Sequence, residues 1–309
     1  RPSRTELSRH RGTGRPLLPA ISLGLWHNFG DVDTLSLSRK KLHYAFDHGI
    51  THFDLANNYG PSYGSAEETF GQIMKSSFAP YRDELFISTK AGHDMWPGPY
   101  GNWGSRKHLM ASLDQSLKRM NLDYVDVFYS HRYDPETPLE ETLQALVDIV
   151  RKGKALYVGL SKYPLDAYLL ACHYLRERDV PCLLYQGRYS MLVREPESQG
   201  ILNAVKENGS GFVAFSPLAQ GLLTNRYLNG IPDDSRIARG GFLKKEALTP
   251  EVLSKIQALN ERAAMRGQSL AEMALAWLLK NETVTSVIVG ASSVEQLGDS
   301  LKTLNHLSF

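Results

Sequence analysis

The chain has 309 residues, 42% of them hydrophobic and 22% charged, and its formal net charge is +2. These values are typical of a soluble globular protein with a large core, and so small a net charge does not favour a nucleic-acid partner. The two cysteines, Cys172 and Cys182, lack the spacing of a metal site and no apolar run is long enough to span a membrane, so we expect a cytoplasmic protein with reduced thiols and no bound metal.

The chain begins with an arginine-rich segment that contains a single acidic residue, Glu6. This segment has neither a start methionine nor an apolar face, so a transit peptide is not favoured. We expect residues 1–17 to form a flexible tail and residues 18–309 to form one folded domain.

After this segment, short apolar runs alternate with longer segments whose apolar residues recur at spacings of three and four. The short runs predict strands at Ala20–Leu25, Thr51–Leu55, Leu85–Thr89, Tyr124–Tyr129, Leu156–Leu160, Cys182–Gln186, Phe212–Phe215 and Ser286–Val289. The longer segments predict helices at Leu35–His48, Ala66–Ser76, Leu139–Val150, Leu165–Arg176, Gly200–Asn208, Leu270–Leu279 and Val294–Leu304. A further helix is expected to begin at Ser105 as N-cap and to carry Leu109, Leu113, Leu117 and Met120.

Alternating strands and helices imply parallel strands joined by right-handed crossovers. Eight such units, without a linker or a break in composition, favour a single-domain α/β fold of the (β/α)8 TIM-barrel class over a doubly wound sheet. The connection after the seventh strand is the longest, with about 70 residues between Phe215 and Ser286. It is expected to contain a polar loop over Gln220–Thr249 and an extra helix. Long insertions in barrel enzymes commonly lie over the active face.

Polar side chains stand where three of the predicted strands end. The second strand ends in Asp54, with Tyr59 five residues later; the third ends in Lys90 and the fourth in His131. Each has an ordinary structural interpretation when taken alone, as a helix cap, a loop tyrosine, a lysine that reaches solvent or a hydrogen-bonded histidine. Because the C-terminal ends of barrel strands converge on one face, we expect the four side chains to meet there.

Together these groups suit acid catalysis. A tyrosine with the usual pKa of about 10 is a poor proton donor at neutral pH, and a nearby ammonium stabilises the phenolate and lowers that pKa. Asp54 would hold Lys90 charged and fixed, and His131 would hydrogen-bond a substrate oxygen. The arrangement suits delivery of a proton from Tyr59 to a carbonyl oxygen as a hydride reaches the carbonyl carbon.

Nearly the whole chain, from Leu18 to Leu304, resembles the aldo-keto reductases, in the motifs D-L-A-N-N-Y-G, S-T-K, Y-S-H and Y-V-G-L-S. The stretches S-L-G-L-W-H-N-F-G, D-M-W-P-G-P-Y-G, S-P-L-A-Q-G-L-L and G-A-S-S-V-E-Q-L look like the bacterial branch that reduces L-glyceraldehyde 3-phosphate and methylglyoxal. That branch also resembles the potassium-channel β subunits. The resemblance implies that Tyr59 is the general acid, that Lys90 and Asp54 tune it, and that His131 orients the carbonyl.

The resemblance also implies a cofactor, NADPH or NADP+. No G-x-G-x-x-G motif follows a strand, so a Rossmann site is not favoured, and strand-end loops would hold the cofactor instead. The positions implied for it are Gly24, Leu25 and Trp26 at the nicotinamide ribose, Ser161 and Gln186 at the carboxamide, Phe215 beneath the ring, Ser216, Pro217, Leu218 and Gly221 around the pyrophosphate, Arg226 and Arg236 at phosphates, Gly290, Ser292 and Gln296 at the 2′-phosphate, and in addition Asp54.

Two positions depart from the family pattern. Lys162 stands where many relatives have Asn or Ser, and it either contacts the cofactor phosphates or faces solvent. Ser293 replaces an arginine of close bacterial relatives, so a preference for NADPH would rest on neutral donors, with help from Arg226 or Arg236. The stretch around Ser292 and Ser293 also fits an ordinary capping box, and both roles are compatible.

Substrate contacts are less defined. Aromatic residues of the loop Gly92–Ser105, including Trp96, either wall a small pocket or pack on the surface, and His27 is a second candidate contact. A small aldehyde is the expected substrate.

Three hypotheses follow: an NADPH-dependent aldehyde reductase, a cofactor-binding regulatory protein like the channel subunits with little turnover, and a barrel that uses these residues structurally without cofactor. The channel subunits carry Asn at the position of His131, so this histidine favours a working enzyme. By analogy with relatives, a homo-oligomer of four or more subunits is expected.

Overall fold

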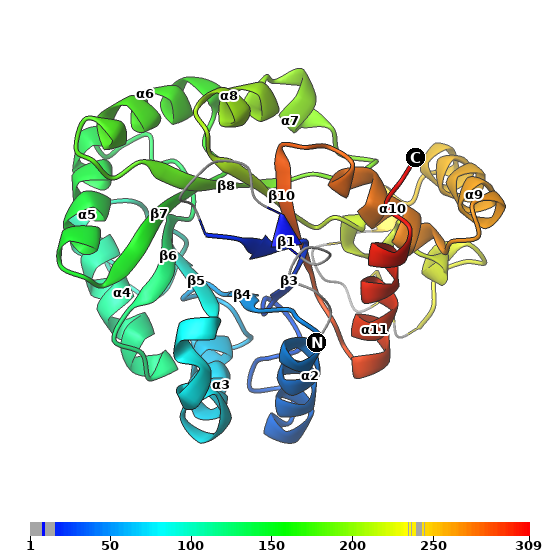
Figure 1. The fold of residues 1–309 in the computed structure, drawn as a ribbon, viewed down its shortest axis with the longest axis horizontal. Coiled ribbons are helices and arrows are strands. Elements are labelled where there is room, and N and C mark those ends of the chain that lie inside the picture. The colour runs from blue at the N-terminus through cyan, green and yellow to red at the C-terminus, as the bar shows by residue number, and fades with distance from the viewer. Residues whose placement is uncertain (1–7, 10–15, 234, 236, 239–242, 244) are drawn as a thin grey trace.

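The chain forms a closed barrel of parallel strands surrounded by helices (Figure 1). The computed structural model describes residues 8–9, 16–233, 235, 237–238, 243 and 245–309. The strand order is β10-β3-β4-β5-β6-β7-β8-β9, so each strand pairs with its neighbours in sequence and the last pairs with the first. The barrel strands are β3 (Ile21–Gly24), β4 (His52–Asp54), β5 (Phe86–Ala91), β6 (Val125–Ser130), β7 (Ala155–Ser161), β8 (Cys182–Arg188), β9 (Gly211–Phe215) and β10 (Val284–Val289). The predicted eight-stranded barrel is confirmed.

The helices of the outer ring follow the strands they were predicted to follow. They are α2 (Leu35–Asp47), α3 (Ser65–Ile73), α4 (Arg106–Met120), α5 (Leu139–Arg151), α6 (Leu165–Arg176), α7 (Glu195–Ser198), α8 (Ile201–Glu207), α9 (Pro250–Met265), α10 (Leu270–Leu279) and α11 (Val294–Lys302). Ser105 caps α4 as predicted, since its hydroxyl accepts the backbone N–H of His108. Among the described residues, no helix is long and apolar enough to cross a membrane.

One helix boundary differs from the prediction. A single helix was expected over Ala66–Ser76, but α3 ends at Ile73. The chain then forms a π-helix over Met74–Phe78 and a 3-10 helix over Ala79–Glu84. Phe78 packs its ring against Phe53 of β4, with 5.8 Å between ring centroids. Burial of this aromatic side chain accompanies the local change of helix type.

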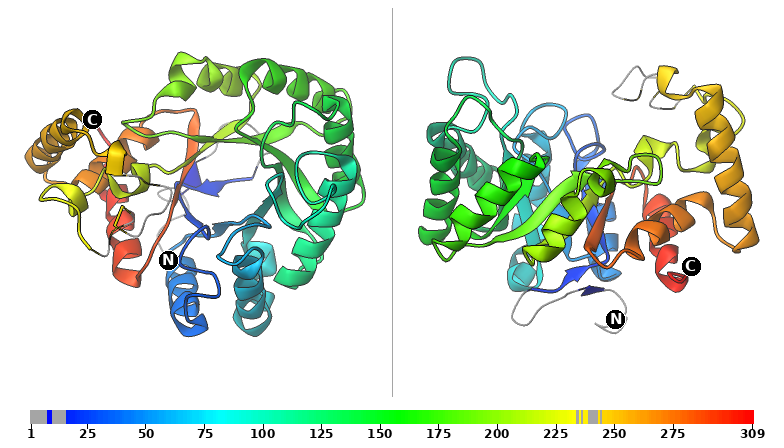
Figure 2. Two further views of the ribbon diagram at one scale, coloured as in Figure 1. Left: turned by 180° about the vertical axis from the view of Figure 1, so that it is seen from behind. Right: turned by 90° about the horizontal axis from the view of Figure 1, so that it is seen from above.

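One end of the barrel carries a short hairpin. Strand β1 (Ser8–Arg9) pairs antiparallel with β2 (Leu18–Pro19), and Figure 2 shows it at the end of the barrel opposite to the loops that follow the strands. The Leu18 side chain is buried in the cluster that fills the barrel interior. Residues 1–7 and 10–15 of the expected tail lie outside the described residues, so the tail remains a prediction.

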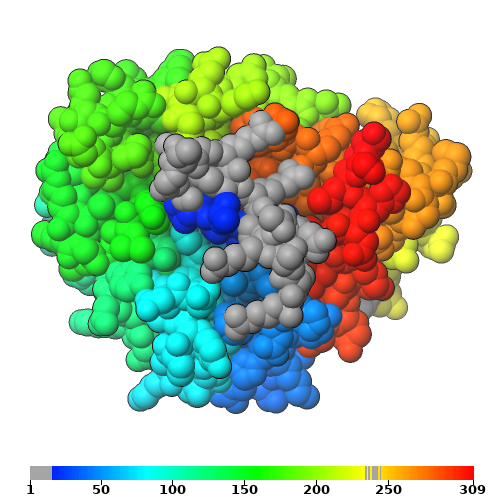
Figure 3. Space-filling model, in the orientation of Figure 1, coloured from blue at the N-terminus to red at the C-terminus, as the bar shows by residue number. Residues whose placement is uncertain are grey.

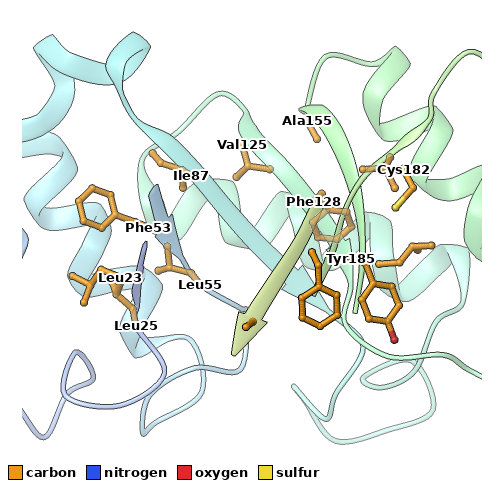
Figure 4. Packing of buried hydrophobic residues seen from close by; sticks show 14 of the residues in the cluster. Leu23, Leu25, Phe53, Leu55, Ile87, Val125, Phe128, Ala155, Cys182 and Tyr185 are labelled. Atoms are coloured by element: carbon orange, nitrogen blue, oxygen red, sulfur yellow. The ribbon is translucent and has the colours of Figure 1, made fainter. Parts of the chain in front are cut away.

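The main core lies between the barrel and its helices. Alternate residues of the strands point outward into it, among them Leu23 and Leu25, Phe53 and Leu55 (Figure 4). The residues between these point into the barrel, so a period of two separates the core layer from the interior. Cys172 and Cys182 are buried free cysteines.

The long segment after β9 has a core of its own, which the sequence did not predict. Leu222, Leu223 and Tyr227 pack with Ile256 of α9 and Met273 of α10. The expected extra helix is confirmed as α9, but part of the loop predicted to be polar is therefore an apolar packing unit. Apolar residues at irregular spacing give no helical or strand periodicity, which is why the pattern was missed.

The first and last helices of the ring lie side by side. Figure 1 shows α2 next to α11, and the space-filling view shows the same contact between the blue and red ends of the chain (Figure 3). The hydrogen-bonded pairing of β10 with β3 closes the barrel beneath them.

Candidate functional site

Lys90 is the centre of a buried polar site at the ends of β4 and β5. Its ammonium Nζ lies 2.7 Å from Asp54 Oδ2, 2.7 Å from the carbonyl oxygen of Leu55 and 3.1 Å from the hydroxyl of Tyr59. The Lys90 side chain is fully buried and Asp54 nearly so. The structure therefore brings Asp54, Tyr59 and Lys90 together as predicted, and all three donors of the ammonium have an acceptor.

The pKa values of this group follow from burial and from the ion pair. Burial lowers the pKa of Lys90, but the charges and hydrogen bonds of Asp54 and Tyr59 outweigh it and raise the pKa above its usual value. Burial raises the pKa of Tyr59, and Lys90 offsets only part of this because Asp54 acts in the opposite direction. Lys90 lowers the pKa of Tyr59 as expected, but the expectation of a pKa below the usual value is wrong, because burial outweighs the effect of Lys90. Tyr59 keeps its proton at neutral pH and is available as a donor.

Asp54 is fixed by two further hydrogen bonds. Ser88 Oγ donates to Asp54 Oδ1 at 2.7 Å, and Gln186 Nε2 donates to the same oxygen at 3.1 Å. With Lys90 on the other oxygen, both carboxylate oxygens are engaged and the side chain is held in one orientation. Gln186, which the resemblance assigns to a cofactor carboxamide, thus hydrogen-bonds Asp54 in this structure.

A chain of buried hydrogen bonds continues from Ser88 to the first and last strands. His52 Nε2 lies 3.0 Å from Ser88 Oγ, His52 Nδ1 lies 2.8 Å from Ser22 Oγ, and Ser22 Oγ lies 2.6 Å from Ser286 Oγ. Burial lowers the pKa of His52 to about 4, so its ring is neutral. Since Ser88 donates to Asp54, it must accept from His52 Nε2–H, and Ser22 must donate to His52 Nδ1. The hydrogen-bonding protons of Ser22, His52 and Ser88 thus point toward Asp54.

His131 lies beside Tyr59 at the end of β6. The two rings meet edge to face with 6.0 Å between centroids. Burial and then the positive charge of Lys90 place the pKa of His131 well below its usual value, so the ring is neutral. Nδ1 is buried and has no hydrogen-bond partner among the described residues. A neutral imidazole of this kind can donate one N–H to a carbonyl oxygen.

Lys162 hydrogen-bonds His93, whose ring contacts His131. Its Nζ lies 2.9 Å from His93 Nε2, and the His93 ring meets His131 edge to face at 4.4 Å between centroids. His93 follows β5 and Lys162 follows β7, so the hydrogen bond spans the end of the strand between them. His93 was missed from the sequence, because nothing in the one-dimensional pattern pairs these two strand ends.

The loop after β5 is held by side-chain contacts, although Tyr100 and Trp103 are exposed. Arg132 donates to the carbonyl oxygen of Gly92 at 2.9 Å and to Asn102 Oδ1 at 2.6 Å, and its guanidinium stacks 3.6 Å above the ring of Trp103. Trp96, a candidate substrate contact, packs against His108 of α4 with 5.0 Å between ring centroids. His27, the other candidate, packs against Trp26 at 4.1 Å.

Several positions implied for the cofactor lie at strand ends on the same rim. Ser161 and Gln186 are direct partners in the pairing of β7 with β8, and Gly24 is the partner of Asp54 in the pairing of β3 with β4. A side chain on Gly24 would lie 2.6 Å from Ile288, so packing alone requires glycine there. Leu25 is fully buried, and Phe215 ends β9 half-buried.

The segment Ser216–Gly221 has an unusual backbone. Ser216, Ala219, Gln220 and Gly221 all have positive φ, between 49° and 99°. The N–H groups of Ala219 and Gly221 donate to the carbonyl oxygens of Ser216 and Leu218, so the segment folds as a series of tight turns. The pyrophosphate role that the resemblance implies for Ser216, Pro217, Leu218 and Gly221 stays a prediction.

The start of α11 is capped by its own side chains. Ser293 Oγ accepts the N–H of Gln296, while Gln296 Oε1 accepts from the N–H and the hydroxyl of Ser292 at 2.8 and 3.0 Å. The capping interpretation is confirmed. A side chain on Gly290 would meet no atom within 4 Å, so open space remains beside this helix end for a phosphate. Arg226 lies in the long segment after β9, and Arg236 lies outside the described residues.

The comparisons with known proteins agree with this geometry. The family model "Aldo/keto reductase family" matches residues 20–309. The chain is 57% identical over 306 residues to the L-glyceraldehyde 3-phosphate reductases of Escherichia coli O157:H7 and strain K12, covering 97% of this chain and 88% of each relative. It is 36% identical over 291 residues to a probable voltage-gated potassium channel subunit beta of Arabidopsis thaliana, covering 92% of this chain and 87% of that protein.

Among solved structures, a thermostable aldo-keto reductase in complex with the inhibitor epalrestat aligns with a TM-score of 0.75 at 30% identity. The alignment covers 97% of this chain and 94% of that one. The same barrel is thus shared along nearly the whole length.

Proposed function

The chain belongs to the aldo/keto reductase family, and from this premise we propose that it reduces small aldehydes, such as L-glyceraldehyde 3-phosphate and methylglyoxal, with NADPH as hydride donor and Tyr59 as general acid. The observation that carries the mechanism is the hydrogen bond between Lys90 Nζ and the Tyr59 hydroxyl, with Asp54 on the other side of the ammonium. By analogy with relatives, we propose that the enzyme acts in the cytoplasm as a homo-oligomer.

In the proposed mechanism, the Tyr59 hydroxyl gives its proton to the carbonyl oxygen of the aldehyde. The phenolate that remains is held by Lys90, whose ammonium already points at that oxygen. His131 is neutral and donates an N–H to the same carbonyl oxygen, which polarises the carbonyl and fixes its direction. Asp54 contacts neither the substrate nor the proton that Tyr59 transfers. Its role is to keep Lys90 charged and in position.

Members of this family generally use NAD(P)H, and the bound cofactor would supply the hydride. The proposed cofactor contacts are supported by the adjacent positions of Ser161 and Gln186 and by the open space beside Gly290. Ser293 carries no charge at the 2′-phosphate position, so the proposed preference for NADPH over NADH rests on neutral hydrogen-bond donors there.

Replacement of Tyr59 by Phe tests the mechanism. We expect Tyr59→Phe to lower kcat for methylglyoxal by roughly 10²–10⁴-fold, the usual contribution of a general acid, while NADPH binding measured by quenching of tryptophan fluorescence is unchanged. Tyr81→Phe is the matched control, because Tyr81 is exposed on the 3-10 helix before β5. Normal turnover by Tyr59→Phe would refute the assignment, and tight NADPH binding with negligible turnover by the wild type would favour a regulatory role instead.

A further inference from the structure

Three basic side chains gather beside His131 at the mouth of the barrel. They are His93 after β5, Arg132 after β6 and Lys162 after β7, on three neighbouring strands. Lys162 hydrogen-bonds His93, and the ring of His131 contacts both His93 and Tyr59. The ring of His131 therefore separates His93 from Tyr59, the proposed proton donor.

The contact of Lys162 is unusual for a lysine. Its ammonium donates to a neutral ring nitrogen, although a carboxylate or phosphate would be the stronger acceptor. Lys162 has a φ of 57°, in the left-handed region that non-glycine residues seldom adopt. Lys162 is exposed to solvent, yet desolvation by its neighbours and the charges of Lys90 and Arg132 lower its pKa to about 8.

The charges around Lys162 are not balanced. Lys90 is paired with Asp54, and the carboxylates of Asp94 and Asp134 act on Arg132. Lys162 forms no ion pair with a carboxylate in the part of the chain that the structure describes, and the charges that shift its pKa and that of His93 are all positive. A site of this composition favours an anion, whose charge offsets the repulsion and supplies a charged acceptor.

We propose that Lys162, with His93 beside it, binds the phosphate of a short phosphorylated aldehyde whose carbonyl lies against His131 and Tyr59. The proposal rests on the proposed reductase function and names its substrate class. The Lys162 ammonium transfers its hydrogen bond from His93 Nε2 to a phosphate oxygen, and the free ring nitrogen of His93 can then take a proton and donate to the same phosphate. Arg132 contributes charge only, because Gly92 and Asn102 hold its guanidinium.

The test compares two aldehydes that differ only in the phosphate, L-glyceraldehyde 3-phosphate and L-glyceraldehyde, with the NADPH-loaded enzyme. Lys162→Met keeps an unbranched side chain that is one heavy atom shorter and removes its charge. We expect kcat/KM to fall roughly 10- to 100-fold for the phosphorylated aldehyde, as for loss of a charge-assisted hydrogen bond, and to stay nearly unchanged for the other. Lys152→Met is the matched control, since Lys152 is exposed after α5, before β7 begins.

Binding of DL-glycerol 3-phosphate to the NADP+ complex separates this proposal from the reductase function. The expected result is a thermal shift in the wild type and in Lys152→Met that is much smaller in Lys162→Met. If no aldehyde is reduced but this shift remains, the anion site stands and the proposed function fails. An equal loss for both aldehydes with weaker NADPH binding would assign Lys162 to the cofactor and overturn the proposal, as would no loss for either aldehyde.

Discussion

On one side of the barrel interior the strands present Ser286, Ser22, His52 and Ser88, whereas on the other side they present Val127, Leu184 and Val213. Both sets are almost completely buried. The polar side, formed by β10, β3, β4 and β5, ends in Asp54 and Lys90 through an unbroken chain of hydrogen bonds. The apolar side, formed by β6, β8 and β9, is held by packing.

The two sides therefore differ in what a substitution does. A lost side chain on the apolar side leaves a cavity, whose cost is stability. A lost side chain on the polar side leaves a buried partner without its hydrogen bond and frees the next group along the chain. The polar side connects stability with the orientation of Asp54 through its chain of hydrogen bonds, whereas β8 contacts Asp54 through the side chain of Gln186.

Lys90→Met should have the largest effect, because it leaves Asp54 buried without its cationic partner. We expect a loss of about 3–5 kcal/mol in the free energy of unfolding, measured in urea, and a fall in kcat of roughly 10²–10⁴-fold. The double variant with Asp54→Asn should lose less stability than the sum of the two single variants. Additive losses would show that the two side chains are not coupled.

Leu184→Ala tests the apolar side. The side chain is buried in the interior cluster, so its truncation should cost roughly 2–5 kcal/mol in unfolding free energy. At a temperature where the variant is folded, kcat should be unchanged, since no hydrogen bond leads from Leu184 to the site. A large fall in kcat for the folded variant would contradict the division of the interior into two functional halves.

His52→Asn gives a smaller effect that depends on pH. The folded pKa of His52 is about 4, against 6.5 as the ordinary value, so between these values the unfolded chain binds a proton that the folded chain does not. Stability is therefore retained above pH 6.5 and lost as the pH falls toward 4, by roughly 3 kcal/mol from this residue. His52→Asn should be less stable than wild type at pH 7, and this difference should shrink on acidification.

Urea unfolding at several pH values measures that difference. The exposed His173 provides the control substitution, His173→Asn, which should leave the pH dependence as in the wild type. A constant difference between wild type and His52→Asn across this range would mean that the pKa of His52 is the same in the folded and the unfolded chain, which would contradict the lowered pKa.

The barrel and its site were predictable from the sequence to different degrees. Periodicity alone gave the strands, and the rule that strand ends converge brought Asp54, Lys90 and His131 together. The supporting residues carried a readable signal that was missed. His52 and Ser88 each precede a site residue by two positions, which places them on the same inward face of their strands.

Other features had no signal in the chain. The contact of Lys162 with His93 depends on the directions of two side chains across an intervening strand. The direction of the Tyr59 pKa shift depends on how far burial exceeds the charge of Lys90, a balance that only the three-dimensional environment sets.

The hydrogen bond between Ser22 and Ser286 joins residues that are 264 positions apart. It crosses the pairing of β10 with β3, the last strand with the first, which forms only after nearly the whole chain has been synthesised. Contacts between such distant positions are slow to form during folding. The chain of hydrogen bonds that ends at Asp54 is therefore complete only when the barrel closes. Asp54, Lys90 and Tyr59 are thus fully ordered only at the end of folding.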